Sequence, residues 1–287
     1  MKYSSNNNSL QKNLKELSSF LGNNLDWIQG AGGNTSVKDN GILWVKASGY
    51  WLSEALNKNI FTPLDRQAVL DKIDQEIEDL GSAQILEKHY HSLRPSIETT
   101  LHALMRQRFV VHVHSVNVIS YAVLKDGKAI LDEKLKGIKW LWVPYVRPGL
   151  PLTKMLKKMN VSDFDVIILA NHGVVIGGDT KEEVLDIFKQ VETRLCRSVR
   201  GNFLETEKPK LESLVDSLDY KLPKHDLTHC LARDDLLLEI IGKNALYPDH
   251  VIFLGPGAIP VMTQEEFINR FSEESSNLHY KVVVIKG

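Results

Sequence analysis

Two histidines occupy alternate positions in an apolar run of the sequence. The run FVVHVHS, residues 109–115, has the β-branched composition of a buried strand. Because alternate side chains of a strand leave the same face, we expect His112 and His114 to point together. Two buried imidazoles need partners, and a divalent metal ion satisfies one nitrogen of each ring. Hydrogen-bonded core histidines are the alternative, and the spacing alone does not decide between the two.

A third histidine favours the metal site. His172 lies in the segment LANHGVVIGG, where we expect the turn 171–173 to join two apolar strands. A histidine at the end of a buried strand can meet two histidines on another strand of the same sheet. Three histidines with an open fourth position form the ligand pattern of a catalytic zinc site, although His172 could also be a simple turn residue. The other histidines are interpreted as surface or hydrogen-bonded core residues: His89, His91, His102, His225, His229, His250 and His279.

Glu98 is a candidate general acid–base. It lies in RPSIETTLH, in the first turn of a helix that Pro95 and Ser96 are predicted to open, with Ser96 as its cap. A carboxylate at this position commonly complements the helix macrodipole. If it lies close to a metal-bound substrate and is partly desolvated, the same carboxylate can move a proton near neutral pH.

Three short segments carry small or donor-rich residues that suit an anion. They are GAGGNTS at 30–36, KASG at 46–49, and Ser96. The first is not a dinucleotide-binding loop, because threonine replaces the last glycine and a strand follows instead of a helix. Its backbone N–H groups could still cradle a phosphate or a carboxylate, whereas each segment alone is more often just a turn.

Helices and strands alternate along the chain, which predicts a layered sheet with helices on its faces. Apolar spacing predicts helices over 9–22, 63–81, from 96 onward, 152–159 and 180–201, and strands over 42–48, from 109 through at least 114, and on both sides of the turn at 171–173. A polar, charged stretch near 203–210 suggests a linker. The predicted division is a catalytic domain over 1–208 and a small extension over 209–287, with a helix at 234–243 and strands at 250–255 and 281–287.

Composition excludes several classes of protein. The chain has 287 residues, a formal net charge of −1 and 43% hydrophobic residues, so it has no overall field that would attract nucleic acid or an anionic membrane. No apolar run approaches the roughly 20 residues of a membrane span, and the polar start does not resemble a signal peptide. Cys196 and Cys230 are isolated, which fits reduced thiols and predicts a cytoplasmic protein.

Taken in order, these motifs resemble the class II aldolase/adducin family. The resemblance spans about residues 10–200 and rests on the residues at 33–36, 46–49, 95–102, 112–114, 148–149 and 171–173. It is closest to the branch that includes the aldolase part of bifunctional rhamnulose-phosphate aldolase/dehydrogenases, whose extension the segment 247–256 also resembles. No GxGxxG fingerprint of a dehydrogenase follows in this sequence.

The resemblance implies a fold, an assembly and a set of site residues. The implied fold is a three-layer α/β/α sandwich around a mixed, mostly antiparallel sheet, and the implied assembly is a cyclic homotetramer with active sites at subunit contacts. The implied roles are zinc ligation by His112, His114 and His172, acid–base catalysis by Glu98, and phosphate binding by Gly33, Asn34, Ser48, Gly49 and Ser96. Ile97 departs from the pattern, because many members have a second phosphate-binding serine there.

The predicted activity is zinc-dependent retro-aldol cleavage of a small sugar or sugar phosphate through a metal-stabilised enediolate. Glu98 would carry the proton at the enediolate carbon. Epimerisation or dehydration of a sugar phosphate on the same site is an alternative. A non-catalytic, adducin-like interaction module is another, but a pure scaffold has no need of three histidines and Glu98.

Overall fold

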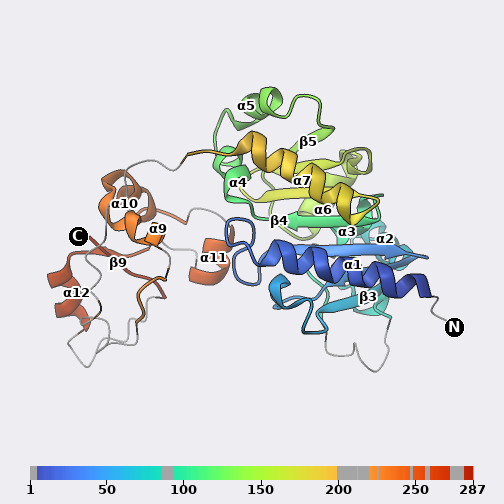
Figure 1. The fold of residues 1–287 in the computed structure, drawn as a ribbon, viewed down its shortest axis with the longest axis horizontal. Helices are drawn as coiled ribbons and strands as arrows, with labels where there is room; N and C mark the ends of the chain where they lie inside the picture. Colours follow the sequence, from blue (N-terminus) through green and yellow to red (C-terminus); the bar gives the residue numbers. More distant parts are fainter. Residues whose placement is uncertain are drawn as a thin grey trace. The chain divides into compact units, whose positions relative to one another are not determined.

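The computed structural model describes residues 5–85, 93–198, 212, 220–224, 226–245, 248–255, 259–271 and 281–286. The chain divides into two compact units, Met1–Arg197 and Ser198–Gly287, both visible in Figure 1. The predicted boundary at 208 lies outside the described residues, so the division at that position stays a prediction. None of the helices in the described ranges combines the length and the apolar character that crossing a bilayer requires.

A seven-stranded mixed sheet forms the centre of the first unit. Its strand order is β3-β2-β1-β4-β7-β6-β5, and every neighbouring pair is antiparallel except β5 with β6. The strands are β1 (Asn34–Asp39), β2 (Ile42–Lys46), β3 (Phe61–Asp65), β4 (Phe109–Val113), β5 (Trp140–Val143), β6 (Val166–Leu169) and β7 (Gly173–Gly178). β4 is therefore the central strand, with three strands on each side.

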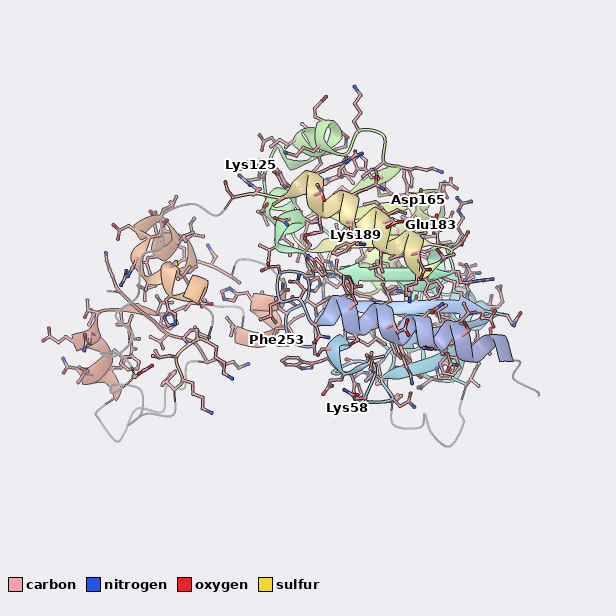
Figure 2. The ribbon with its side chains drawn as sticks, viewed as in Figure 1. Lys58, Lys125, Asp165, Glu183, Lys189 and Phe253 are labelled. Atoms are coloured by element: carbon pink, nitrogen blue, oxygen red, sulfur yellow. The ribbon has the colours of Figure 1, made fainter. Side chains whose placement is uncertain are left out.

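One face of the sheet packs against the helices α1 (Ser5–Gly22), α4 (Val116–Ala122) and α7 (Lys181–Leu195). Alternate β4 residues, Phe109, Val111 and Val113, enter this core. Charged side chains such as those of Glu183 and Lys189 point outward from α7 (Figure 2). The short helix α5 (Gly127–Lys134) follows α4 and packs against it.

The opposite face packs against α2 (Arg66–Asp74), α3 (Thr99–Leu104) and α6 (Leu150–Lys158). Val110 of β4 and Val175 of β7 belong to this second core. Helices thus cover both faces of the sheet, which confirms the predicted three-layer α/β/α architecture (Figure 1). Short 3₁₀ turns connect the elements at η1 (Leu52–Glu54), η2 (Gly81–Ala83) and η3 (Val161–Asp163).

The second unit is a small α/β module. It contains α9 (Asp226–His229), η4 (Cys230–Arg233), α10 (Asp235–Ile241), α11 (Pro248–Leu254), α12 (Gln264–Phe271) and the short parallel pair β8 (Val261–Met262) and β9 (Val284–Ile285). The predicted strand at 250–255 is wrong, because these residues lie in or just after α11. The proline at the start of this helix and Asp249 in its first turn are helix-starting signals that outweigh the apolar run after them.

Several predicted elements are shorter than their hydrophobic pattern suggested. The helix predicted over 63–81 ends at Asp74, and its first three residues belong to β3, an edge strand that tolerates Pro63. Asp65 caps α2 by accepting a hydrogen bond from the amide of Ala68, and Glu76 beyond the helix has a positive φ of 59°. The helix predicted over 180–201 ends at Leu195, while Gly201 lies outside the described residues.

β4 and β7 approach each other closely where β7 begins. Gly173 is the first residue of β7, and a Cβ atom added there would lie 2.5 Å from the carbonyl oxygen of Val113. The same atom would lie 3.0 Å from the His114 ring and 3.3 Å from the His112 ring. Only glycine fits this position without moving the strand or the two rings.

We predict that Gly173→Ala destabilises the first unit by about 1–3 kcal/mol through overpacking and weakens metal binding, because the histidine rings must shift. Gly137→Ala is the control: its φ is 87° and its Cβ would meet nothing within 4 Å, so only backbone strain of about 1–2 kcal/mol is added. Urea unfolding and zinc titration measure both effects. A Gly173→Ala protein that binds zinc as tightly as wild type would contradict the account.

Candidate functional site

The central strand places His112 inside the sheet on the face that α3 and α6 cover. His112 alternates with Val111 and Val113, so it shares the face of Val110. Its register partners are Asn34 on β1 and Val175 on β7. The ring is completely buried and donates a hydrogen bond from Nδ1 to the carbonyl oxygen of Val174, at 3.1 Å.

His114 lies just after β4, where the chain leaves the sheet. Its backbone N–H donates to the carbonyl oxygen of Trp27 instead of to a neighbouring strand, at 3.0 Å. Glu192 of α7 stabilises this turn. It accepts hydrogen bonds from Trp27 Nε1 and Asn117 Nδ2, both at 3.0 Å, and from the hydroxyl of Ser115. The strand therefore ends one residue earlier than its apolar pattern suggests, and helix α7 fixes the direction in which His114 leaves it.

His172 lies in the tight turn between β6 and β7, as the sequence predicts. Its backbone N–H donates to the carbonyl oxygen of Leu169, at 3.1 Å, and Asn171 before it adopts a left-handed conformation with φ of 53°. Asparagine tolerates this conformation better than most residues. The turn leads into β7, which pairs with β4, and it places the His172 ring beside the His112 ring.

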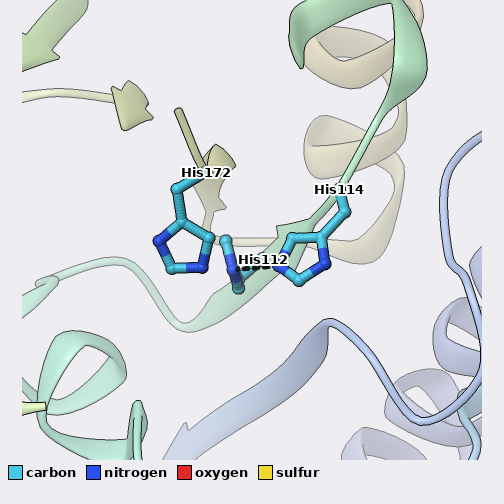
Figure 3. A group of neighbouring side chains, drawn as sticks. All are labelled: His112, His114 and His172. Atoms are coloured by element: carbon cyan, nitrogen blue, oxygen red, sulfur yellow. Dashed lines mark hydrogen bonds between the residues drawn. The ribbon is translucent and has the colours of Figure 1, made fainter. Parts of the chain in front are cut away.

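The three rings converge on one point (Figure 3). His112 Nε2 lies 3.0 Å from His114 Nε2, and each histidine offers a ring nitrogen within 4.8 Å of those of the other two. Four ligands placed tetrahedrally around zinc at 2.0–2.1 Å are about 3.3 Å apart, so the rings need only small movements to share one ion. All three side chains are buried, with exposed fractions of 0–5%.

Burial and hydrogen bonding leave a lone pair on His112 directed at this point. Burial, the largest influence, holds the pKa of His112 well below its usual value, so the ring is neutral. Because Nδ1 carries the proton donated to Val174, Nε2 of the neutral ring is unprotonated. A backbone-anchored imidazole of this kind is the usual form of a histidine that binds a metal ion.

Glu98 faces the same point from α3. Its Oε1 atom lies 3.2 Å from His172 Nε2 and 3.5 Å from His112 Nε2, and it forms no hydrogen bond with any residue in the described ranges. Burial raises the pKa of Glu98, but the adjacent His112 and His172 rings outweigh it and hold the pKa well below its usual value. A buried carboxylate oxygen that has no hydrogen bond within the described residues and lies beside these rings fits the presence of a cation at the centre of the site.

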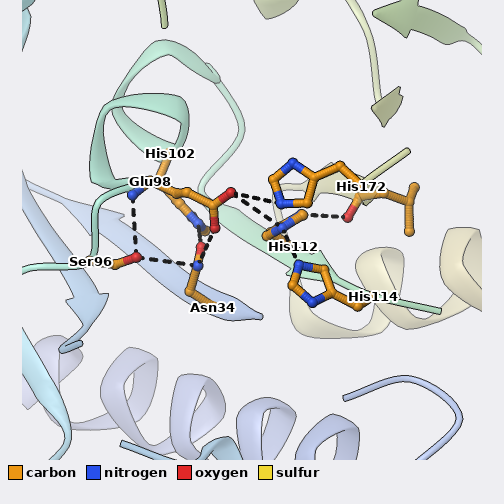
Figure 4. Close-up of polar contacts among 8 residues, drawn as sticks. Asn34, Ser96, Glu98, His102, His112, His114 and His172 are labelled. Carbon is orange, nitrogen blue, oxygen red and sulfur yellow. Dashed lines mark hydrogen bonds and ion pairs between the residues drawn. The ribbon is translucent and has the colours of Figure 1, made fainter. Parts of the chain in front are cut away.

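Glu98 occupies the N-cap position of α3, which corrects the predicted start of this helix. The helix begins at Thr99, and Ser96 does not cap it. Instead, Ser96 Oγ accepts weak hydrogen bonds from the Glu98 N–H and from Asn34 Nδ2, both at 3.3 Å. Asn34 Nδ2 also donates to Glu98 Oε2, at 2.8 Å (Figure 4). The turn before α3 thus directs the carboxylate into the site instead of along the helix axis.

A cavity of about 1040 Å³ borders this turn. Its walls are formed by residues of segments 73–84, 93–100 and 147–151, together with Ser48. Ser96 lines the cavity and also accepts a hydrogen bond from the Glu98 N–H, so the cavity reaches the turn that carries Glu98. Arg94 and Arg147 line it as exposed cations, with Glu78 and Asp79 on another wall.

The structure brings the predicted anion-binding residues together only in part. Asn34 and Ser96 lie beside Glu98, and Ser48 lines the cavity. Gly33 and Gly49 are not among the described residues that line the cavity. Gly33 has a φ of 62° and packs under the backbone of His112, where an added Cβ would lie 2.8 Å from the His112 carbonyl oxygen.

Sequence reasoning missed three groups of site residues. The sequence suggested an ordinary surface or core role for His102, but its ring forms hydrogen bonds with both Ser36 and Asn34. Its position four residues after Glu98 puts both on one side of a helical turn, and this spacing could have identified it. Glu192, in contrast, lies far from the motifs in sequence, so no local pattern pointed to it. Arg94 and Arg147 directly precede the motif residues at 95–102 and 148–149, and sequence reasoning did not consider them.

Comparisons with known proteins agree with this geometry. The sequence profile described as "Class II Aldolase and Adducin N-terminal domain" matches residues 14–198. A curated relative, "Uncharacterized oxidoreductase YuxG" of Bacillus subtilis, is 34% identical over 193 residues, which are 60% of this chain and 27% of the relative. This chain therefore spans about a quarter of that relative's length.

Solved structures also resemble the fold. The N-terminal class II aldolase domain of a conserved protein from Thermoplasma acidophilum is 25% identical, with a TM-score of 0.56, over 68% of this chain and 94% of that one. A sugar-phosphate aldolase from Thermotoga maritima is 14% identical, with a TM-score of 0.49, over 76% and 99% of the two chains.

The two halves of the site are separable by mutation. We predict that His112→Ala loses most of the bound metal, whereas Glu98→Gln retains it, because only the former removes a ring nitrogen from the cluster. Elemental analysis after zinc loading and desalting should find about one ion per chain in wild type and in Glu98→Gln. Full zinc content in His112→Ala would refute the ligand assignment.

His102 makes the stability of the protein depend on pH. Burial, with a smaller contribution from the charge of Lys38, lowers the pKa of His102 to about 3. In the unfolded chain His102 is therefore protonated as the pH falls through 6.5, whereas in the folded protein it is protonated only near pH 3. Stability consequently falls as the pH falls through this window, by about 1.4 kcal/mol per pH unit for this residue.

Urea unfolding of wild type and His102→Gln at pH 6.0 and 5.0 measures this effect. We predict a smaller loss of stability in the variant between the two pH values, by about 1 kcal/mol, because glutamine does not titrate there. Equal losses in the two proteins would show that His102 is not held neutral.

Proposed function

Because the chain belongs to the class II aldolase and adducin family, we propose that its first unit is a metal-dependent aldolase that cleaves a small sugar or sugar phosphate. The observation that carries the proposal is the gathering of three buried histidine rings beside Glu98 Oε1, which forms no hydrogen bond within the described residues. A scaffold without activity would gain nothing from burying these groups together, since each costs free energy unless a ligand satisfies it.

His112, His114 and His172 would hold the metal ion, and zinc is the ion that three imidazoles with one open position suit best. When bound, the ion would polarise a substrate carbonyl and stabilise the negative charge that develops on its oxygen as the carbon–carbon bond breaks. The hydrogen bond from His112 to Val174 would keep the ring in the tautomer that this task needs.

Glu98 would move the proton. Its low pKa keeps it ionised at neutral pH, so it starts as a base. In the condensation direction it takes a proton from the carbon next to the substrate carbonyl. In cleavage the ionised carboxylate would first receive the proton that leaves the substrate hydroxyl as the aldehyde forms, and would then give it to that same carbon. Asn34 Nδ2 holds Oε2 of the carboxylate, so the oxygen available for the proton is Oε1.

The cavity beside Ser96 would hold the rest of the substrate. Ser48 and Ser96 line it, and Arg94 and Arg147 supply positive charge that suits a phosphate or carboxylate at the far end. Ile97, 67% exposed, stands where many relatives place a second serine. The arginines offer other donors for an anionic group. A homotetramer with sites at subunit contacts remains part of the proposal from the family resemblance alone.

Epimerisation and dehydration of a sugar phosphate are the alternatives on the same site. Both begin with the breaking of a bond next to a metal-polarised carbonyl, so the same residues could serve them. The products separate the three reactions, since cleavage releases an aldehyde, epimerisation inverts a stereocentre without changing mass, and dehydration releases water.

The test is a screen of ketoses and ketose 1-phosphates with the zinc-loaded wild-type chain and with Glu98→Gln. We predict that wild type releases an aldehyde from at least one substrate and that Glu98→Gln is about 10²–10⁴ times slower. Aldehyde detection and NMR of the product mixture report the result. Stereocentre inversion without an aldehyde would replace the proposal with an epimerase, and full activity of Glu98→Gln would remove Glu98 from the reaction.

A further inference from the structure

A chain of buried polar groups runs behind Glu98 on the side away from the histidine rings. Ser36 Oγ lies 2.7 Å from His102 Nδ1, His102 Nε2 bonds Asn34 Oδ1, and Asn34 Nδ2 donates to Glu98 Oε2. All four side chains are buried, with exposed fractions of 0–8%. These hydrogen bonds connect β1, which carries Ser36 and Asn34, to α3, which carries His102.

The orientation of the Asn34 amide sets the direction of this series of hydrogen bonds. Its NH₂ group faces Glu98 and donates to Oε2. The carbonyl oxygen of Asn34 therefore faces His102, and the ring must carry its proton on Nε2. His102 Nδ1 is then an acceptor, and the Ser36 hydroxyl donates to it. The orientation of the Asn34 amide thus sets every proton position back to Ser36.

We propose that His102 is a positioning residue, which locks the Asn34 carboxamide so that Glu98 presents Oε1 to the three histidines. The proposal rests on the function proposed above for Glu98. His102 lies behind Asn34 and would act on the substrate only through Asn34 and Glu98. Its ring is neutral because burial lowers its pKa to about 3, and this state lets one nitrogen donate while the other accepts.

The position of Asn34 explains why its orientation matters. Asn34 on β1 is the register partner of His112 on β4, so the amide lies on the strand next to a predicted metal ligand. If the carboxamide turned over, its oxygen would meet Glu98 Oε2 at the present distance of 2.8 Å and repel it. The carboxylate would then rotate, and Oε1 would no longer stay fixed beside His112 and His172.

The histidine opposes this rotation. With its proton on Nε2, the ring bonds an oxygen but not an NH₂ group, so a turned amide would require the ring proton to move to Nδ1 and the Ser36 hydroxyl to become the acceptor. Leucine has a similar volume but no donor, whereas the amide nitrogen of glutamine can reach roughly the place of Nε2. The pair His102→Leu and His102→Gln therefore separates donation to Asn34 from filling of space.

The experiment compares these variants as zinc-loaded 287-residue chains on a substrate that wild type cleaves. We expect His102→Leu to lower kcat by about 10- to 100-fold with little change in KM and with full zinc content. His102→Gln should recover most of the loss. Activity is expressed per folded, zinc-loaded chain, so loss of folded protein alone does not produce the effect.

Ser18→Ala is the matched control. The Ser18 hydroxyl lies 2.6 Å from Thr35 Oγ1 and is equally buried, but Thr35 faces α1, on the other side of the sheet from Asn34 and Ser36. The substitution removes a buried hydrogen bond of the same strand and should lower stability without changing kcat. If His102→Leu behaved like Ser18→Ala, with wild-type kcat, His102 would be a structural residue and the proposal would be wrong.

A second measurement does not depend on activity. ¹⁵N NMR of histidine-labelled, zinc-loaded protein distinguishes protonated from unprotonated ring nitrogens, and His102→Gln assigns the signals. We expect His102 to be protonated on Nε2. A ring protonated on Nδ1 would overturn the proposal whatever the activity. A ring protonated on Nε2 in a protein that cleaves no substrate would overturn the proposed function while supporting the orientation of Asn34 and Glu98.

Discussion

The hydrogen bond from His112 Nδ1 to the carbonyl oxygen of Val174 is the interaction on which the rest of the site depends. It joins a side chain of the central strand to the backbone of the neighbouring strand, and it decides which nitrogen of the ring carries the proton. Because the two strands are held in register by the sheet, the lone pair of Nε2 is held with them. The close approach at Gly173 lets this contact form next to the turn that carries His172. Backbone packing thus fixes the position of a nitrogen that we propose as a metal ligand.

The site has two parts with different structural origins. The three histidines come from β4 and from the turn between β6 and β7, so strand pairing sets their positions. The carboxylate comes from the turn before α3, and buried side-chain hydrogen bonds set its direction. Charge connects the two parts, since a cation between the three rings and the Glu98 carboxylate would satisfy both of them. Neither part explains the burial of the other unless a positively charged ligand belongs to the site.

The sequence predicted those features that depend on local periodicity. The alternation around His112 placed it on a buried strand, and the two apolar segments around Asn171 located the turn that carries His172. Local patterns failed where contacts distant in sequence decide the outcome. β4 ends before His114 because Trp27 and Glu192 hold the chain after it. The segment 250–255 joined a helix because the residues before it favour a helix start, although its own composition suits a strand. His102 looked like an ordinary core histidine, because nothing in its sequence neighbourhood reveals that Asn34 on a distant strand is its partner.

The central claim is that His112, His114 and His172 bind one metal ion with Glu98 beside it. Anomalous X-ray diffraction at the zinc edge, from crystals of the zinc-loaded chain, tests it most directly. The account predicts a single strong peak between the three rings, about 2.0–2.1 Å from one nitrogen of each, including Nε2 of His112. A peak at another place in the first unit, or no peak between the rings at saturating zinc, would contradict it.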